Sequence, residues 1–282
     1  MKLKRLLLPC LIFIPFVSYG SRNYTNIAHM YAIARPAYPQ ELFTNILSKL
    51  SHKTDDIYLD LGCGTGELLV PLAQHFKHCF GVDPDAAMLD EAAKKLQTIE
   101  KANVSLIKST SEEYFSSLPT TTKLSLVTAG RALPWMNQQL VIQGVYNRLD
   151  KGGMLAIVMD AGGSFWKTDT IWFNAVRPII FESFTHKKPF VPIKGINMSL
   201  DVIKSNVKSF PFEAIENFEI SMQKEWDIQS IINLFYSGTG FLDWLAADKE
   251  EFEHRVKKTL LAMRPDGVFV DTVTFEVIFC VK

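Results

Sequence analysis

Residues 59–66 read Leu-Asp-Leu-Gly-Cys-Gly-Thr-Gly, and this stretch decides the fold. A short apolar run leads into it and a helical pattern of apolar residues follows at once, which predicts a buried strand that turns sharply into a helix. Glycines at alternate positions permit that turn and bring backbone N–H groups against a ligand, beside the partial positive charge of a helix N-terminus. About twenty residues further on, Asp83 ends the next predicted strand, where an acid can accept both hydroxyls of an adenosine ribose.

The spacing of the glycines argues against a dinucleotide site. A dinucleotide loop has the pattern G-x-G-x-x-G, whereas here the third glycine comes one residue early. Asp60, two residues before the first glycine, would repel a pyrophosphate. The pattern therefore predicts an adenosine that carries an amino acid in place of phosphates, and an NAD-dependent oxidoreductase is set aside.

Strands and helices alternate through the first two thirds of the chain. Continuous apolar runs rich in β-formers predict strands buried on both faces, and amphipathic segments predict helices between them. This alternation gives a parallel sheet with right-handed crossovers. The predicted strands are 56–61, 78–82, 104–107, 124–128 and 154–159, and the predicted helices are 67–76, 86–96 and 137–149.

The last third of the chain has a different pattern of predicted strands and helices. Segments 212–224 and 268–281 read as two further strands that close the sheet with an antiparallel edge, which makes seven strands in all. Asp227 begins one helix between them, and Asp248 begins another with Glu251 as the partner of a capping box. The insertion 162–206 is rich in aromatic residues, which form either its own core or a helical cap over a ligand pocket.

The amino-acid composition limits the kinds of partner expected for this protein. The 282 residues are 48% hydrophobic and 21% charged, as in ordinary globular domains, and 30 Lys+Arg balance 30 Asp+Glu. Without a basic field, nucleic acid is not expected as the main partner. The four cysteines form no C-x-x-C pair, so neither a metal site nor a disulfide framework is predicted. Nothing in the sequence indicates an oligomeric state.

Residues 1–20 have the layout of a secretory signal peptide. Lys2, Lys4 and Arg5 precede an apolar run, 6–17, and small residues follow at Ser18 and Gly20. The run is shorter than the ~20 residues of a membrane-spanning helix. We expect an exported or membrane-associated protein, with association through residues 1–20. An apolar arm or a misassigned start on a cytoplasmic protein is the alternative.

Four segments together resemble the class I S-adenosylmethionine-dependent methyltransferases of the small-molecule type 11 kind. They are YLDLGCGTG (58–66), GVDPDAAML (81–89), LSLVTAGRALPWM (124–136) and LDKGGMLAIVM (149–159). In addition, residues 31–39, YAIARPAYP, resemble the N-terminal segment of the subgroup that includes trans-aconitate-like methyltransferases. The resemblance extends over 21–282, with a cofactor-binding core at 54–160 and C-terminal strands and helices at 207–282. It implies a Rossmann-like fold, with helices on both faces of the sheet, that binds S-adenosylmethionine and methylates a small molecule.

The resemblance also assigns the site. The glycines would pack against the methionine part of the cofactor, Asp60 would lie near its amino group, Asp83 would bind the ribose and Met88 would line the adenine. Two positions depart from the family: Thr110 stands where an Asp is usual, and Pro134 where a His is frequent. The implied cofactor-binding residues are Tyr31, Arg35, Asp60, Gly62, Cys63, Gly64, Thr65, Gly66, Asp83, Pro84, Met88, Thr110, Ser111, Glu112, Ala129, Gly130 and Arg131.

Methyl transfer from a sulfonium asks little of side chains, because the methyl is already electrophilic and needs alignment and exclusion of water. A general base is needed only for a protonated acceptor, and Asp160 and Glu112 are the candidates. Arg35 and Arg131 could clamp an acidic acceptor or the cofactor carboxylate. The predicted substrate-pocket residues are Tyr38, Trp135, Trp166, Tyr236 and Trp244. A non-catalytic protein that keeps the fold and binds S-adenosylmethionine is the alternative, which the changes at Thr110 and Pro134 leave open.

Overall fold

The computed structural model describes residues 24, 27–50, 56–99, 103–161, 170–185, 199–238 and 248–282. The signal-like segment 1–20 lies outside these residues. So do 162–169 and 186–198 of the predicted cap insertion, and with them Trp166, and also Trp244.

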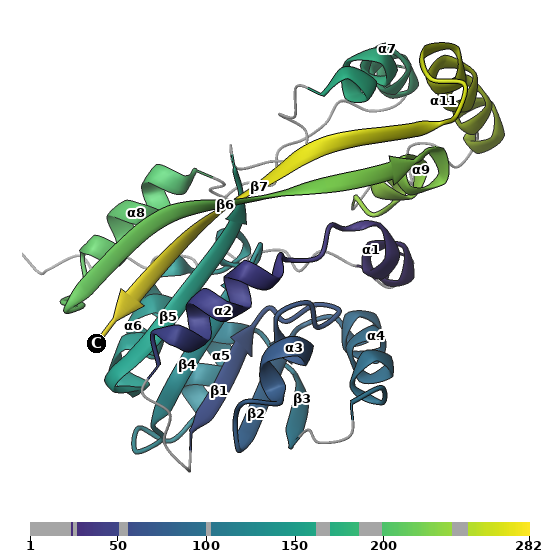
Figure 1. The fold of residues 1–282 in the computed structure, drawn as a ribbon. Coiled ribbons are helices and arrows are strands. Elements are labelled where there is room, and N and C mark those ends of the chain that lie inside the picture. The colour runs from purple at the N-terminus through teal and green to yellow at the C-terminus, as the bar shows by residue number, and fades with distance from the viewer. Residues whose placement is uncertain are drawn as a thin grey trace, which may run out of the picture.

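A seven-stranded sheet forms the centre of the molecule, in the order β3-β2-β1-β4-β5-β7-β6 (Figure 1). Strands β1 to β5 pair in parallel, β7 runs antiparallel to β5, and β6 runs antiparallel to β7. The predicted fold, a mostly parallel seven-stranded sheet with an antiparallel edge, is therefore confirmed. The strands are β1 (Ile57–Leu61), β2 (His78–Asp83), β3 (Val104–Lys108), β4 (Leu124–Gly130), β5 (Leu149–Asp160), β6 (Ala214–Asp227) and β7 (Val268–Val281).

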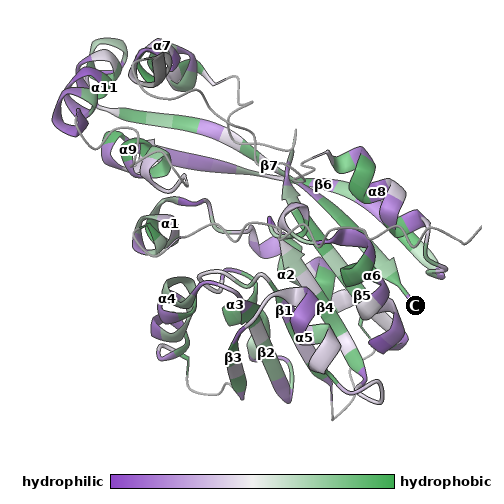
Figure 2. Cartoon of the chain, turned by 180° about the vertical axis from the view of Figure 1, so that it is seen from behind, coloured by the Kyte–Doolittle hydropathy of each residue, from purple (hydrophilic) through white to green (hydrophobic). Residues whose placement is uncertain are grey.

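Helices cover both faces of the sheet, because successive residues of each strand point to opposite sides. On β1, Tyr58 packs under α2 and α3, whereas Leu59 packs under α5 and α6. Figure 2 shows that the strands are coloured mainly hydrophobic where the helices cover them. The helices are α1 (Ala28–Ala34), α2 (Gln40–Ser48), α3 (Leu69–Ala73), α4 (Ala86–Leu96), α5 (Ser111–Ser117), the 3-10 turn η1 (Leu133–Trp135), α6 (Gln138–Arg148), α7 (Ile171–Thr185), α8 (Leu200–Lys208), α9 (Ile228–Tyr236) and α11 (Lys249–Met263).

The helix starts follow local chemistry, with one correction. Asp227 caps α9 as predicted, since its carboxylate accepts the Ser230 N–H at 2.6 Å. The capping box predicted at Asp248 is wrong, because that side chain makes no cap hydrogen bond at the start of α11. A complete capping box instead opens α5, where Thr110 and Glu113 exchange side-chain and backbone hydrogen bonds. This helix is not among those predicted from the sequence.

The two antiparallel strands, β6 and β7, extend further than the parallel strands beside them. Strand β5 ends at Asp160, opposite Phe275 of β7, but β7 continues to Val268, opposite Asp227 of β6. The overhanging part of β6 and β7 is therefore a two-stranded ribbon that extends past the carboxyl end of β5. Helices α7, α9 and α11 lie along this ribbon in Figure 1.

An aromatic cluster of its own fills the space between the ribbon and these helices. Its members include Trp172, Phe173, Trp226, Phe235 and Phe252. We call this unit, made of the ribbon with α7, α9 and α11, the cap. The described part of the predicted insertion belongs to two different units, because α7 lies in the cap whereas α8 packs against α6 on the sheet. Within the described residues, no helix has both the length and the apolar character that a membrane span requires.

Candidate functional site

The loop after β1 has the backbone conformation that only glycine adopts readily. Gly62, Gly64 and Gly66 all have positive φ, at 61°, 53° and 87°. A Cβ at Gly62 would also lie 2.6 Å from the Cβ of Ala132, so both conformation and space require glycine there. At Gly64 a Cβ would meet nothing closer than a carbonyl oxygen at 4.0 Å, so this residue faces open space. The loop therefore presents bare backbone at that point.

A pocket opens at the carboxyl ends of β1 and β4, the two neighbouring strands at which the order of the sheet reverses. Its walls come from α1, the linker 35–39, the glycine loop and the end of β4. The structure thus brings together eight residues that the sequence analysis assigned to the site, and adds Glu67 and Leu68. The lining residues are Tyr31, Tyr38, Asp60, Gly62, Cys63, Gly64, Glu67, Leu68, Gly130 and Arg131.

Asp60 makes the floor of this pocket acidic. It is buried, accepts a hydrogen bond from the Thr128 hydroxyl, and has no ion-pair partner among the described residues. Burial raises the pKa of Asp60 to about 8, and the nearby charges of Glu67 and Asp83 act in the same direction. A cationic group bound here would relieve both effects, so the floor is suited to an ammonium or sulfonium.

Asp83 shapes the glycine loop from the end of β2. One carboxylate oxygen accepts the Gly64 N–H at 2.9 Å and the other accepts the Asp85 N–H at 2.9 Å. Burial raises its pKa to about 6, while these two hydrogen bonds oppose the shift. Each oxygen keeps a further lone pair, with which it can accept a hydrogen bond from a ligand hydroxyl.

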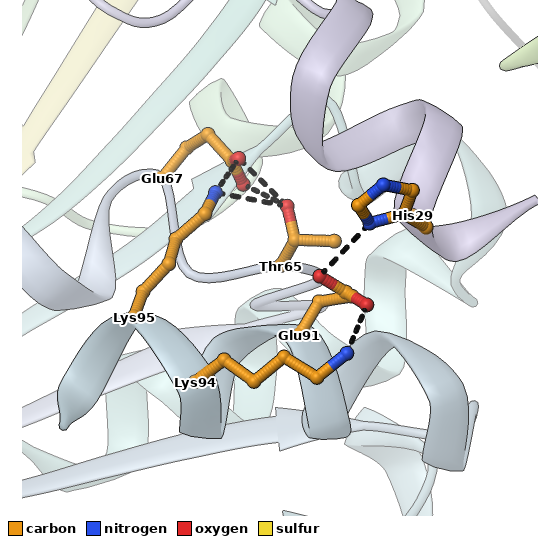
Figure 3. A network of polar contacts seen from close by, with 6 residues as sticks. All are labelled: His29, Thr65, Glu67, Glu91, Lys94 and Lys95. Atoms are coloured by element: carbon orange, nitrogen blue, oxygen red, sulfur yellow. Dashed lines mark hydrogen bonds and ion pairs between the residues drawn. The ribbon is translucent and has the colours of Figure 1, made fainter.

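A polar network joins the loop to α4 (Figure 3). The Thr65 hydroxyl donates to Glu67 at 2.6 Å, and Lys95 of α4 donates to the same carboxylate. Figure 3 shows a second group beside it, in which His29 of α1 lies 3.7 Å from a Glu91 oxygen. Sequence reasoning counted Glu67 only as the first residue of a helix. Its position directly after the last glycine was the available signal.

Arg131 is the basic residue of the pocket lining. Its side chain is only 9% exposed, and Nε donates to Oδ1 of Asp160 at 2.8 Å. Burial opposes its charge, but Asp160, Tyr38 and Tyr31 more than compensate and raise the pKa of Arg131 above its usual value. Asp160, predicted as a general base, is therefore engaged in an ion pair.

Two other predicted residues cap helices. Glu112, the second candidate base, accepts the backbone N–H of Asn137 at the start of α6. Thr110 uses its hydroxyl to cap α5, and the neighbouring Ser111 is buried. Neither Glu112 nor Thr110 lines the pocket.

The remaining predicted residues that the structure describes are not part of the pocket lining. Met88 is buried at the start of α4, after Pro84, and Ala129 is buried in β4. The Arg35 guanidinium lies over the Tyr31 ring, with Cζ 5.1 Å from the centroid. Trp135 donates its indole N–H to the Arg131 carbonyl at 3.2 Å.

Tyr236 lies in the aromatic cluster of the cap. It is 2% exposed and donates its hydroxyl hydrogen to Glu253 at 2.8 Å. The structure thus places it away from the pocket lining, where it joins α9 to α11. No group of three metal-ligating side chains occurs in the part of the chain described.

Comparisons with known proteins agree on one domain type. Residues 59–155 match a family model described as a methyltransferase domain. The chain is 31% identical over 144 residues to the Saccharomyces cerevisiae protein named "Probable S-adenosylmethionine-dependent methyltransferase CRG1", which covers 50% of this chain and 47% of that one. It is 24% identical over 257 residues to a Dictyostelium discoideum protein described as a candidate methyltransferase, with 88% of each chain covered. The chain thus spans about half the length of the first relative and most of the second.

A solved structure extends the likeness of fold to most of the chain. A protein of Anaeromyxobacter dehalogenans, described as a candidate type II methyltransferase, superposes with a TM-score of 0.61 at 18% identity. The superposition covers 88% of this chain and 97% of that one.

Proposed function

We propose that the chain is a class I S-adenosylmethionine-dependent methyltransferase and that it transfers the methyl group of S-adenosylmethionine to a small-molecule acceptor. The support is the methyltransferase domain matched at residues 59–155, together with the likeness in sequence and fold to proteins described as methyltransferases. The observation that carries the proposal is the charge pattern of the pocket. Its lining contains two acids, Asp60 and Glu67, together with the basic residue Arg131. This pattern is complementary to the amino-acid end of the cofactor.

The residues present fit S-adenosylmethionine. Asp60, a buried acid without an ion-pair partner among the described residues, would hold the cationic ammonium end, and Arg131 would receive the carboxylate. Asp83 would accept hydrogen bonds from the ribose hydroxyls, and Met88 would lie against the adenine. The bound cofactor supplies an electrophilic methyl group, so the chain's own task is to align an acceptor and keep water away.

The surroundings of the pocket suit that task. Tyr31 and Tyr38, from the N-terminal part of the chain, line it, and the cap extends beyond the carboxyl end of β5 (Figure 1). An acceptor bound between the cap and the pocket would be shielded from solvent. The balance of 30 basic and 30 acidic residues supports a small molecule rather than nucleic acid as the acceptor.

Calorimetric titration of the full chain with S-adenosylmethionine tests the first half of the proposal. We expect saturable binding that Asp83→Ala weakens by at least about tenfold, equivalent to roughly 1.4 kcal/mol. Asp266→Ala, which changes an exposed acid of the turn before β7, is the matched control and should bind as the parent does. A well-folded chain that does not bind the cofactor would contradict the proposal.

Transfer of a labelled methyl group in a whole-cell extract, which contains both small metabolites and macromolecules, tests the second half. We expect label in molecules that pass a membrane retaining proteins. Label confined to macromolecules would contradict a small-molecule acceptor. Binding of the cofactor without any transfer would favour the non-catalytic alternative.

We further propose that residues 1–20 direct the chain to a membrane or through it. The support is the sequence of this segment, with its basic start, its apolar run and its small residues before Ser21. A reporter fused after Gly20 should be exported or found with membranes. A reporter that stays cytosolic and uncleaved would refute this.

A further inference from the structure

One side chain joins four separate parts of the molecule at the pocket. Arg131 donates through Nε to Asp160 at the end of β5 and through Nη1 to the carbonyl oxygen of Pro36 at 3.1 Å. Its Cζ lies 4.9 Å from the ring centroid of Tyr38 and 5.2 Å from that of Phe275 on β7. Its backbone directly follows β4, and the residue lines the pocket.

The backbone at Arg131 is strained in a way that serves this arrangement. Its φ is 55°, and it is the one non-glycine residue with positive φ in the described ranges. This conformation costs an L-residue about 1–2 kcal/mol and persists only where the surroundings impose it. Gly130 before it has no Cβ, and a Cβ there would lie 2.6 Å from the Tyr38 hydroxyl. Two adjacent residues are thus adapted to a close fit with the linker 35–39.

The linker 35–39 decides where the N-terminal wall of the pocket lies. It connects α1, which packs against α9 of the cap and α4 of the core, to α2 on the sheet. Figure 1 shows α1 between α9 and α4. Tyr31, in α1, and Tyr38, in the linker itself, both line the pocket. The contacts of Arg131 with Pro36 and Tyr38 therefore fix the part of the wall that must fit against a bound ligand.

Asp160 makes this arrangement stable. A buried guanidinium without an acid beside it is costly, and Asp160 is its ion-pair partner. The carboxylate also fixes the direction of Nε, and with it the plane that lies against Tyr38. We propose that Asp160 is a positioning residue, which acts through Arg131 to hold the linker 35–39 and Tyr38 over the cofactor pocket, and that it is not the general base. The identity of the ligand in this inference rests on the proposed function.

Hydrogen exchange of the full chain, free and with S-adenosylhomocysteine, tests the positioning role with three variants. Asp160→Asn removes the charge at constant shape, and the double variant Arg131→Gln with Asp160→Asn removes both charges and leaves no unpaired ion. Asp266→Asn, in the exposed Arg264–Asp266 pair, is the control. We expect exchange in residues 31–39 to become about tenfold faster in both site variants and to stay unchanged in the control. The dissociation constant for S-adenosylhomocysteine should rise about tenfold in the same two variants.

Two results would overturn the inference. The first is that Asp160→Asn slows single-turnover methyl transfer by about 10²–10⁴, while hydrogen exchange and cofactor affinity stay those of the parent. This result would identify Asp160 as a general base. The second result is faster exchange in Asp160→Asn but exchange like that of the parent in the double variant. It would mean that the faster exchange comes only from the unpaired buried charge of Arg131. If the parent chain bound no cofactor, the proposed function would fail, but exchange at 31–39 would still decide whether the pair positions the linker.

Discussion

At the residue scale, the acid on the pocket floor makes cofactor binding depend on pH. The pKa of Asp60 is raised to about 8 in the ligand-free protein, so Asp60 is mostly protonated at pH 7. A cationic ligand favours the ionised form and drives the proton off. We expect binding of S-adenosylmethionine at pH 7 to release a proton, and affinity to rise from pH 6 to about 8. Calorimetry in buffers of different ionisation enthalpy measures the release, which Asp60→Asn should abolish.

The raised pKa of Asp60 also makes the stability of the ligand-free chain depend on pH, but in the opposite direction to cofactor affinity. An acid whose pKa is higher in the folded state holds a proton that the unfolded state has already lost. Folding therefore loses stability as the pH rises from the ordinary value near 4 through about 8. Urea unfolding at pH 6 and pH 8 should show this loss in the parent and a smaller one in Asp60→Asn. Equal losses in both proteins would mean that Asp60 is not the group responsible.

Arg131 gives the third prediction at this scale. If its guanidinium receives the cofactor carboxylate, Arg131→Lys should weaken binding of S-adenosylhomocysteine about tenfold or more, because lysine cannot reproduce the planar fork. Binding of 5′-methylthioadenosine, which lacks the amino-acid end, should change less. Equal loss for both ligands would contradict a direct contact with the carboxylate and would assign the effect to the position of the linker.

The sequence predicted the residues whose chemistry is local. The glycines and Asp83 were predictable because turn geometry and strand-end position follow from a short stretch of chain. The pairing of Arg131 with Asp160 was not, because it depends on β4 and β5 being neighbours whose carboxyl ends meet. Glu67 was hidden for another reason, since its place in a helical pattern explained it without reference to the loop.

At the element scale, α5 depends on its capping box. The Thr110 hydroxyl accepts the Glu113 N–H at 3.2 Å, and the Glu113 carboxylate accepts the Thr110 N–H in return. Thr110→Ala should cost about 1 kcal/mol of unfolding free energy in urea. Ser116→Ala, within the same helix on an exposed side chain, should cost less. A cost no greater than that of the control would mean that the cap does not stabilise the helix.

The cap was only partly predictable, again for a reason of geometry. Both strands of the ribbon were predicted near their true bounds, and Asp227 was recognised as a helix start. Their overhang follows only from the point at which β5 stops pairing, at Asp160 opposite Phe275. The aromatic residues of the insertion predict a cap formed by residues 162–206, whereas α9 and α11 of the cap come from the C-terminal part of the chain.

At the scale of the whole molecule, α1 connects the cap to the core, since it packs against both α9 and α4. Its residue Tyr31 lines the pocket, so a ligand that contacts Tyr31 contacts both units indirectly. Binding at the floor of the pocket should therefore stabilise α1 and α9 together, rather than the glycine loop alone. With ligand at a hundred times its dissociation constant, the global gain is about 2.7 kcal/mol.

Hydrogen exchange with and without S-adenosylhomocysteine measures how that stabilisation is distributed. We expect added protection in residues 28–34 and 228–236 as well as in 62–66. Helix α8, on the sheet face away from the pocket lining, serves as the internal control and should gain only what global stabilisation gives every element. Tyr31→Ala should keep the protection of 62–66 and lose that of 228–236, because the path from the pocket to the cap runs through α1. Protection confined to the loop and α4 in the parent would show that the cap does not respond to the cofactor, and would separate acceptor binding from cofactor binding in this protein.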